Sequence, residues 1–254
     1  MELRDTVAVV TGGCTGIGRA TVLALADAGV RGVAASWTRS SDAADALVAD
    51  AAGRGCDVLT APADVTDDAA VRAFADGVLD RFGRVDVLVN NAGTTRAVPE
   101  SDLDGLTDAI WHEVLDVNVV GAFRSTRAFA PALREASGAV VNVSSISAYR
   151  AGGSSIAYGV SKAAMVQLTR NLAGALAPDI RVNAVAPGTV ATRWQTGLHG
   201  EEGFAERALA ERETVPLRRT SGPEHVAQAV LGLLGMDMVT GETVIVDGGK
   251  HVRY

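Results

Sequence analysis

Short apolar runs rich in β-branched residues alternate along the chain with longer segments in which apolar residues recur at helical spacing. The short runs predict β-strands at 7–10, 32–36, 56–64, 87–89, 140–143, 181–186 and 243–247. The longer segments predict helices near 17–28, 42–53, 67–82, 103–136, 158–177 and 223–235. Strands that alternate with helices form βαβ units, which build a parallel sheet covered on both faces. The pattern therefore predicts an α/β fold with a doubly wound parallel sheet.

No internal repeat, low-complexity tract or long linker divides the 254 residues, so we expect a single domain over 1–254. Residues 194–222 fit the alternation least well, because they are polar and lie between two strand-like runs. A long excursion in such a domain is either a lid over a binding site or a plain surface helix. We favour the lid, a substrate loop at about 193–222.

Composition and charge narrow the classes of function. The formal net charge of −7 disfavours binding to nucleic acid or to an anionic membrane. No apolar run reaches the roughly 20 residues of a membrane span, and no signal-peptide segment precedes the first strand. The two cysteines, Cys14 and Cys56, and four scattered histidines show no metal-ligand spacing. We expect a cytoplasmic protein that binds a small molecule and no metal, nucleic acid or membrane.

A glycine-rich turn, TGGCTGIG at 11–18, follows the first predicted strand, and Gly12, Gly16 and Gly18 open the first helix. Glycines let the backbone turn sharply and approach a pyrophosphate, whose charge then meets the helix N-terminus. The spacing is GxxxGxG rather than GxGxxG, and a plain tight turn would also use glycine. The position directly after the first strand favours nucleotide binding.

The end of the second strand bears on which dinucleotide would bind. A carboxylate there would accept a hydrogen bond from the ribose 2′-OH, but the sequence AASWTRSS has no acid between Ala34 and Ser41. Arg39 and the neighbouring hydroxyls suit a 2′-phosphate instead, which favours NADP over NAD. Asp64, followed by Val65 after the third strand, either accepts from an adenine amino group or caps a turn.

Tyr158 and Lys162 stand four residues apart in SIAYGVSKAAM, so they share one face of a helix. One interpretation is a half-buried aromatic ring covered by a lysine stem. The other is a reactive pair, since an ammonium stabilises a phenolate and lowers the tyrosine pKa from its usual value of about 10. This stretch alone supports both.

Several motifs in a fixed order resemble the classical short-chain dehydrogenase/reductase family over almost the whole chain. They are TGGCTGIG, NNAG at 90–93, DVNVVG around Asn118, NVSSISA around Ser145, YGVSK around Tyr158, NAVAPGTVAT at 183–192 and TGETVIVDGG at 240–249. The resemblance implies a Rossmann-type sheet with seven strands in the order 3-2-1-4-5-6-7. It also implies a homotetramer or homodimer and hydride transfer between a nicotinamide cofactor and a carbonyl or alcohol.

The resemblance further implies a role for each of four catalytic residues. Tyr158 is the proton donor in reduction and the base in oxidation, and Lys162 tunes it and hydrogen-bonds the nicotinamide ribose. Ser145 holds the substrate oxygen, as an oxyanion donor does, although two other serines lie nearby. Asn118 anchors a water that connects Lys162 to solvent, or simply satisfies backbone groups in a helix.

The expected cofactor contacts come from the loops that follow the strands. They are Gly12, Thr15, Gly16, Ile17, Gly18, Arg39, Asp64, Val65, Asn91, Ala92, Gly93, Tyr158, Lys162, Pro187, Gly188, Val190 and Thr192. NADP-preferring relatives often have a basic residue at the position of Thr15, so Arg39 supports most of the expectation of NADP(H), with NAD(H) the alternative.

The substrate pocket is expected around residues 150–155 and 194–204. Arg150, Trp194 and His199 would meet a carboxylate or a ring there, or else face solvent. The C-terminal segment HVRY, 251–254, would reach a neighbouring subunit.

We therefore expect NADPH-dependent reduction of a ketone to a secondary alcohol, as in 3-oxoacyl carrier-protein reductases. A 3-oxoacyl, polyketide-like or cyclic ketone would be the substrate. The alternatives are an NAD-dependent alcohol or sugar dehydrogenase and a nucleotide-sensing regulator that has lost the chemistry. The presence of both Tyr158 and Lys162 argues against the regulator.

Overall fold

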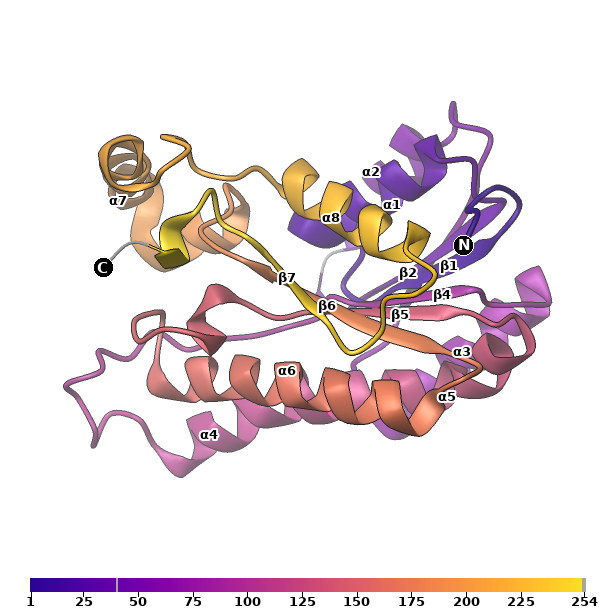
Figure 1. The fold of residues 1–254 in the computed structure, drawn as a ribbon, viewed down its shortest axis with the longest axis horizontal. Coiled ribbons are helices and arrows are strands. Elements are labelled where there is room, and N and C mark those ends of the chain that lie inside the picture. The colour runs from indigo at the N-terminus through magenta and orange to yellow at the C-terminus, as the bar shows by residue number, and fades with distance from the viewer. Residues whose placement is uncertain (40, 253–254) are drawn as a thin grey trace.

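The computed structural model describes residues 1–39 and 41–252, and this part of the chain forms a seven-stranded sheet (Figure 1). The strands are β1 (Val7–Val10), β2 (Gly32–Trp37), β3 (Asp57–Pro62), β4 (Val87–Asn90), β5 (Ala139–Val143), β6 (Arg181–Pro187) and β7 (Thr243–Val246). They pair in parallel in the order β3-β2-β1-β4-β5-β6-β7. The predicted doubly wound fold and its strand order are confirmed.

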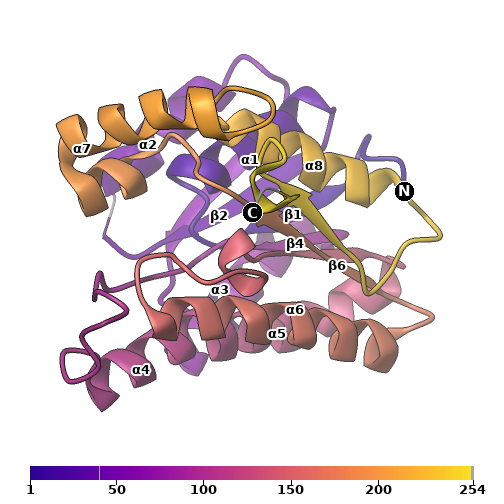
Figure 2. The same ribbon diagram turned by 60° about the vertical axis from the view of Figure 1, so that its left-hand side comes forward.

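Helices cover both faces of the sheet. They are α1 (Gly16–Asp27), α2 (Ser41–Ala51), α3 (Asp68–Phe82), α4 (Asp108–Leu115), α5 (Gly121–Glu135), α6 (Ile156–Leu176), α7 (Arg193–Thr214) and α8 (Pro223–Gly235). Helices α1, α2 and α8 lie on one face, and α3, α4, α5 and α6 on the other (Figures 1 and 2). Helix α7 follows β6 and extends beyond the sheet (Figure 1). No helix in the described part of the chain is both long and apolar enough to span a membrane.

Successive residues of the central strands face opposite helical layers. Val10 packs in the same core as Leu25 of α1 and Leu233 of α8. Its neighbour Val9 packs on the other side of the sheet with Phe129 of α5. Because both faces are buried, these strands appear in the sequence as continuous apolar runs rather than as alternating ones.

The single helix predicted at 103–136 is wrong in two respects. Helix α4 starts only at Asp108, and a π-helical turn, η1 (Asp116–Val120), separates it from α5. The Gly121 amide donates to the Asp116 carbonyl across this wider turn. Apolar spacing does not reveal such a change in backbone hydrogen bonding, which occurs often at functional sites.

The excursion predicted at 194–222 is mostly helical. Helix α7 occupies its first part and contains a kink at Gly200, whose φ is 71°. The surface-helix alternative therefore describes its local structure, while its use as a substrate loop stays a prediction. At the C-terminus, the short 3₁₀ helix η3 (Lys250–Val252) ends the described chain, and Arg253 and Tyr254 of the HVRY segment lie outside the described residues.

Candidate active site

The turn between β1 and α1 lines a cavity of about 770 Å³. Gly12 and Gly16 have φ values of 62° and 53°, in the left-handed region that favours glycine. A Cβ on Gly18 would lie 2.6 Å from Asn91 Nδ2, so the start of the helix has no room for a side chain there. The backbone at the N-terminus of α1 thus borders the cavity directly, an arrangement that suits a phosphate group.

Two hydroxyls lie on either side of this glycine loop. Thr15 occupies the N-cap of α1 and Thr192 the N-cap of α7, but neither side chain caps its own helix. A Cβ on Gly16 would lie 3.7 Å from Thr192 Cβ, so the two helix starts approach closely. Both residues, with Ile17, line the cavity. The loop can therefore offer hydroxyl and backbone donors to a diphosphate.

The NNAG segment holds the glycine loop in place. Asn91 Nδ2 donates to the carbonyl oxygens of Thr11 and Gly12, each at 3.0 Å. The amides of Asn91 and Ala92 both donate to the Thr11 hydroxyl at 3.1 Å. The Asn91 side chain thus holds the glycine loop in place. Asn91, Ala92 and Gly93 also line the cavity.

The residues expected at the adenosine end line the same cavity. Arg39 is exposed, and within the described part of the chain it has no ion pair or hydrogen bond; its neighbour Ser40 lies outside the described residues. Asp64 Oδ1 accepts from the amide and hydroxyl of Thr66 at 2.9 and 2.7 Å, so the Asp64 side chain stabilises the turn after β3. Val65 lies beside it. A glycine loop at a helix N-terminus, open hydroxyls and an exposed guanidinium together fit a dinucleotide.

The segment after β6 forms the opposite wall. Pro187, Gly188, Val190 and Thr192 all line the cavity. A Cβ on Gly188 would lie 2.7 Å from Asp247 Cβ, so glycine is needed for this close approach. Sixteen of the seventeen predicted cofactor residues thus line one cavity. The other, Gly18, does not line it but packs closely against Gly12 and Asn91, which do.

Tyr158 and Lys162 lie one turn apart near the start of α6. Ser155 caps this helix by accepting from the Tyr158 amide at 3.2 Å, which fixes the first turn. Lys162 Nζ donates to the Val143 carbonyl at 2.9 Å and lies 5.6 Å from the centre of the tyrosine ring. The predicted pair therefore shares one buried region, with the lysine anchored to the end of β5.

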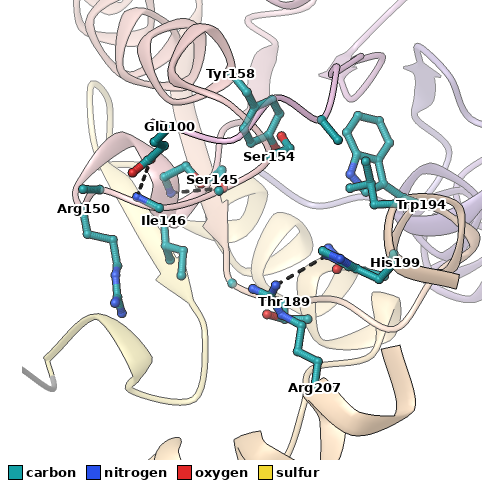
Figure 3. Close-up of a pocket in the computed structure, with 18 of the residues that line it drawn as sticks. Glu100, Ser145, Ile146, Arg150, Ser154, Tyr158, Thr189, Trp194, His199 and Arg207 are labelled. Carbon is teal, nitrogen blue, oxygen red and sulfur yellow. Dashed lines mark hydrogen bonds between the residues drawn. The ribbon is translucent and has the colours of Figure 1, made fainter. Parts of the chain in front are cut away.

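Among the three neighbouring serines, Ser145 faces the tyrosine. It lines the same cavities as Tyr158, and its Oγ accepts from the Ser147 amide at 3.2 Å (Figure 3). The Ser144 hydroxyl instead donates to the Lys162 carbonyl at 2.8 Å, so its proton is already used in a hydrogen bond with the backbone. Ser145 lies beside Tyr158 in both cavities, and its contact with a substrate stays a prediction.

Asn118 lies fully buried in the π-helical turn η1. Its side chain accepts from the Thr94 amide at 2.7 Å and donates to the Thr94 carbonyl at 3.0 Å and to Ser161 Oγ at 2.9 Å. A Cβ on Gly93 would lie 3.3 Å from Asn118 Oδ1 and 3.6 Å from Lys162 Nζ. Asn118 therefore satisfies backbone groups and positions the loop above Lys162, and the water that it was expected to anchor stays a prediction.

Burial controls the charges of the pair. Burial raises the pKa of Tyr158 to about 12, and a hydrogen bond with Ser145 opposes this only in part. Burial also lowers the pKa of Lys162 to about 8. The pKa of Tyr158 is therefore raised rather than lowered as expected, because burial removes the phenolate from water and Ser145 opposes this only in part. At neutral pH the phenol is protonated and suited to donate a proton.

A second cavity, of about 560 Å³, adjoins the first at Ser145, Tyr158, Trp194 and Gln195. The ring centres of Trp194 and Tyr158 are 6.3 Å apart (Figure 3). The predicted pocket residues that line this cavity are Arg150, Ala151, Gly152, Gly153, Ser154, Trp194, Leu198 and His199.

Gln195, inside the segment 194–204 expected at the pocket, also lines the second cavity, whereas sequence reasoning missed Arg207 and Lys250. Gln195 Oε1 is buried and has no hydrogen-bond donor within the described part of the chain. These residues come from separate segments and belong to no motif, so their convergence depends on tertiary structure. Among the described residues, no group of His, Cys, Asp and Glu side chains is arranged to hold a metal ion.

A family model described as enoyl-(acyl carrier protein) reductase matches residues 12–251, and the chain belongs to this short-chain dehydrogenase/reductase family. It is an oxidoreductase that acts on C=O and CH–OH groups, and its family implies a nicotinamide cofactor.

Individual relatives match over nearly their whole length. A Streptomyces violaceoruber protein assigned as ketoacyl reductase 2 of the granaticin polyketide synthase is 44% identical over 247 residues, covering 97% of this chain and 96% of that one. The 3-oxoacyl-[acyl-carrier-protein] reductase FabG of Thermotoga maritima is 36% identical, with 98% and 99% covered. The crystal structure of levodione reductase is similar with a TM-score of 0.86 and 31% identity, covering 99% of each chain.

Proposed function

We propose that this protein is an NADPH-dependent ketoreductase that converts a 3-oxoacyl, polyketide-like or cyclic ketone to a secondary alcohol. The observation that carries the proposal is the position of Tyr158 beside Ser145 at the junction of the two cavities, where burial raises the pKa of the phenol to about 12. The names of the relatives, a ketoacyl reductase, a 3-oxoacyl reductase and a levodione reductase, support reduction of a ketone.

In this mechanism the Ser145 hydroxyl and the Tyr158 phenol hold the ketone oxygen by hydrogen bonds. The nicotinamide cofactor, when bound, supplies the hydride that the carbonyl carbon accepts. Tyr158 transfers its proton to the oxygen as charge develops there, and the Lys162 ammonium stabilises the resulting phenolate. Asn118 anchors the water through which the tyrosine is reprotonated.

The preference for NADPH rests on the adenosine end of the cavity. Arg39 lines it, and β2 ends without a carboxylate that would repel a 2′-phosphate. A guanidinium binds phosphate oxygens through charge-assisted hydrogen bonds. The glycine loop, Thr15 and Thr192 would hold the diphosphate, and Lys162 the nicotinamide ribose.

The proposal predicts that a panel of ketones consumes NADPH, measured by absorbance, with NADH at least about tenfold less effective. The Tyr158→Phe variant should lose roughly 10²- to 10⁴-fold in kcat, because it removes the general acid. NADPH binding to that variant, followed by nicotinamide fluorescence, should be retained. Unchanged turnover in Tyr158→Phe would disprove the mechanism, and preferred consumption of NADH would disprove the cofactor assignment.

A further inference from the structure

We infer that the cavity beside Tyr158 selects ketones that carry an anionic group, and that Arg207 and His199 of α7 bind that group. This inference rests on the proposed ketone reduction and narrows its substrate class. The anion is a carboxylate or a phosphate ester, since both present oxygen atoms that accept hydrogen bonds from a guanidinium.

The two side chains come from opposite sides of the kink at Gly200 and meet at the cavity. Arg207 Nη1 lies 3.5 Å from His199 Nε2 (Figure 3). Both residues line the same cavity as Ser145 and Tyr158. The kink therefore folds α7 back so that two nitrogen-bearing groups face the space that would hold a substrate.

The charged side chains that line this cavity have a positive balance. Arg150, Arg207 and Lys250 line it, as does His199, whereas Glu100 is the one carboxylate among the described lining residues. A cavity lined by one sign of charge concentrates ligands of the opposite sign.

Arg207 forms a long ion pair with Glu211, which binds Lys250 more closely. Glu211 Oε1 is 2.6 Å from Lys250 Nζ but 3.9 Å from Arg207 Nε. In the described part of the chain, no other carboxylate lies within 4 Å of Arg207. Glu211 therefore binds mainly Lys250. The side chain of Arg207 is 42% exposed, and its guanidinium has further N–H donors for a ligand.

The carboxylate of Glu100 makes the two sides of the cavity differ in charge. Its Oε1 accepts from the Gly152 amide at 2.9 Å, and Figure 3 shows it on the opposite side of the cavity from His199 and Arg207. Arg150 lies on the same side as Glu100 and offsets its charge, whereas no carboxylate of the described residues lines the cavity beside Arg207 and His199. An anionic group would therefore be attracted most strongly to the α7 side. A ketone held by Ser145 and Tyr158 would therefore extend its charged end along α7.

The wall between the two ends is partly apolar, formed by Trp194 and Leu198 of α7 and by Ile146. Trp194 lies beside the Tyr158 ring, so a flat or cyclic carbon skeleton fits next to the reacting carbonyl. The preferred substrate is thus a ketone on a ring or acyl chain that ends in an oxyanion.

The test compares matched ketones that differ in charge. One pair is 4-oxocyclohexanecarboxylate and its methyl ester; the other is the 3-oxobutanoyl thioester of 4′-phosphopantetheine and the neutral 3-oxobutanoyl thioester of pantetheine. We expect at least a tenfold higher kcat/KM for the charged member of one pair, mainly through KM. The pair that responds identifies a carboxylate or a phosphate as the group bound.

Variants link the preference to Arg207. Arg207→Gln should reduce the charged-to-neutral ratio of kcat/KM about tenfold, and Arg207→Lys should restore part of it. Arg212→Gln removes an exposed arginine of the same helix that does not line the cavity, and should leave the ratio unchanged. Equal kcat/KM within both pairs, or an unchanged ratio in Arg207→Gln, would overturn the inference.

A binding measurement separates this inference from the proposed function. If neither these four ketones nor any member of the wider panel is reduced with NADPH, the proposed function is wrong. Calorimetric titration of the NADP⁺-saturated protein with cyclohexanecarboxylate and its carboxamide then tests the anion site alone. Binding of the acid that is at least tenfold tighter than binding of the amide, and that is lost in Arg207→Gln, would support the site, and equal binding would overturn it.

Discussion

Burial acts against the charged forms of both Tyr158 and Lys162. The phenol loses stabilisation of its anion, and the ammonium loses hydration, so the pKa of Tyr158 rises to about 12 and that of Lys162 falls to about 8. Within the described part of the chain no carboxylate lies within 4 Å of Lys162, and its Nζ donates to a backbone carbonyl. The cation is therefore available to a phenolate rather than committed to an ion pair.

These pKa values predict opposite pH dependences for the two directions. Reduction needs the protonated phenol and the charged lysine, so its kcat/KM should stay level below pH 7 and decline as pH rises through about 8. Oxidation needs the phenolate, so its rate should increase with pH throughout this range. Initial rates at constant ionic strength measure both profiles. A reduction rate that increases above pH 9 would contradict the assignment.

Arg39 provides a second prediction at the level of a single residue. Arg39→Gln should raise KM for NADPH about tenfold and leave KM for NADH nearly unchanged, because an exposed charge contributes modestly. Arg39→Lys should retain part of the preference, since it keeps the charge but not the planar donor set. Equal increases in KM for both cofactors would indicate a general loss of structure and contradict a 2′-phosphate contact.

At the scale of elements, one polar cluster joins α7 to the C-terminal helix η3 and to the loop after β6. Lys250 Nζ donates to Glu211 Oε1 at 2.6 Å and to Thr189 Oγ1 at 3.1 Å, and the Thr220 hydroxyl donates to Glu211 Oε2 at 2.6 Å. Although burial acts to raise the pKa of Glu211, its hydrogen bonds with Lys250, Thr189 and Thr220 hold it below the usual value. The cluster fixes α7 beside the cavity.

Lys250→Met should loosen this attachment. The variant leaves the buried Glu211 carboxylate without its main partner, and we expect a loss of about 1–2 kcal/mol in the free energy of unfolding, discounted for the partial exposure of Lys250. Trypsin should also cleave within α7 faster than in the wild type. Arg170→Met, at an exposed site on α6, serves as the control. Equal stability and equal cleavage in both variants would show that the cluster does not hold α7.

The sequence predicted whole elements well where one physical signal determines them. The seven strands appear because burial on both faces demands continuous apolar runs, as at Val7–Val10. The π-helical turn at Asp116–Val120 was missed because a change in hydrogen-bond partners leaves the apolar spacing intact. Among candidate site residues, those in motifs come together around one cavity, whereas Arg207 and Lys250 reach the second cavity only through the kink in α7 and the return of the C-terminus, which no local pattern predicts.

At the scale of the whole molecule, the cofactor cavity draws on both halves of the chain. The glycine loop follows β1, whereas Tyr158, Pro187 and Thr192 come from segments after β5. The strand order changes direction between β1 and β4, the position at which open α/β sheets bind ligands. A dinucleotide in this cavity would therefore contact both halves. Assembly into a homotetramer or homodimer stays a prediction of the family resemblance.

Because one ligand would contact both halves, its binding should stabilise the entire fold. At a free concentration 100 times its Kd, a ligand specific for the folded state adds about 2.7 kcal/mol. For a chain of this size, that corresponds to an increase in Tm of roughly 5–11 °C. NADP⁺ should produce this increase in thermal denaturation, and NAD⁺ at the same concentration a smaller one.

Two glycine substitutions show whether the stabilisation depends on the phosphate loop. Gly18→Ala should abolish the increase in Tm, because its Cβ would lie 2.6 Å from Asn91 Nδ2 and displace the loop. Gly174→Ala makes the same change in α6, where a Cβ would meet nothing within 4 Å, and should retain the full increase. This comparison needs no substrate, so it tests cofactor binding independently of catalysis. A wild-type increase in Gly18→Ala would place the dinucleotide outside the glycine loop, and equal increases with both cofactors would remove the preference assigned to Arg39.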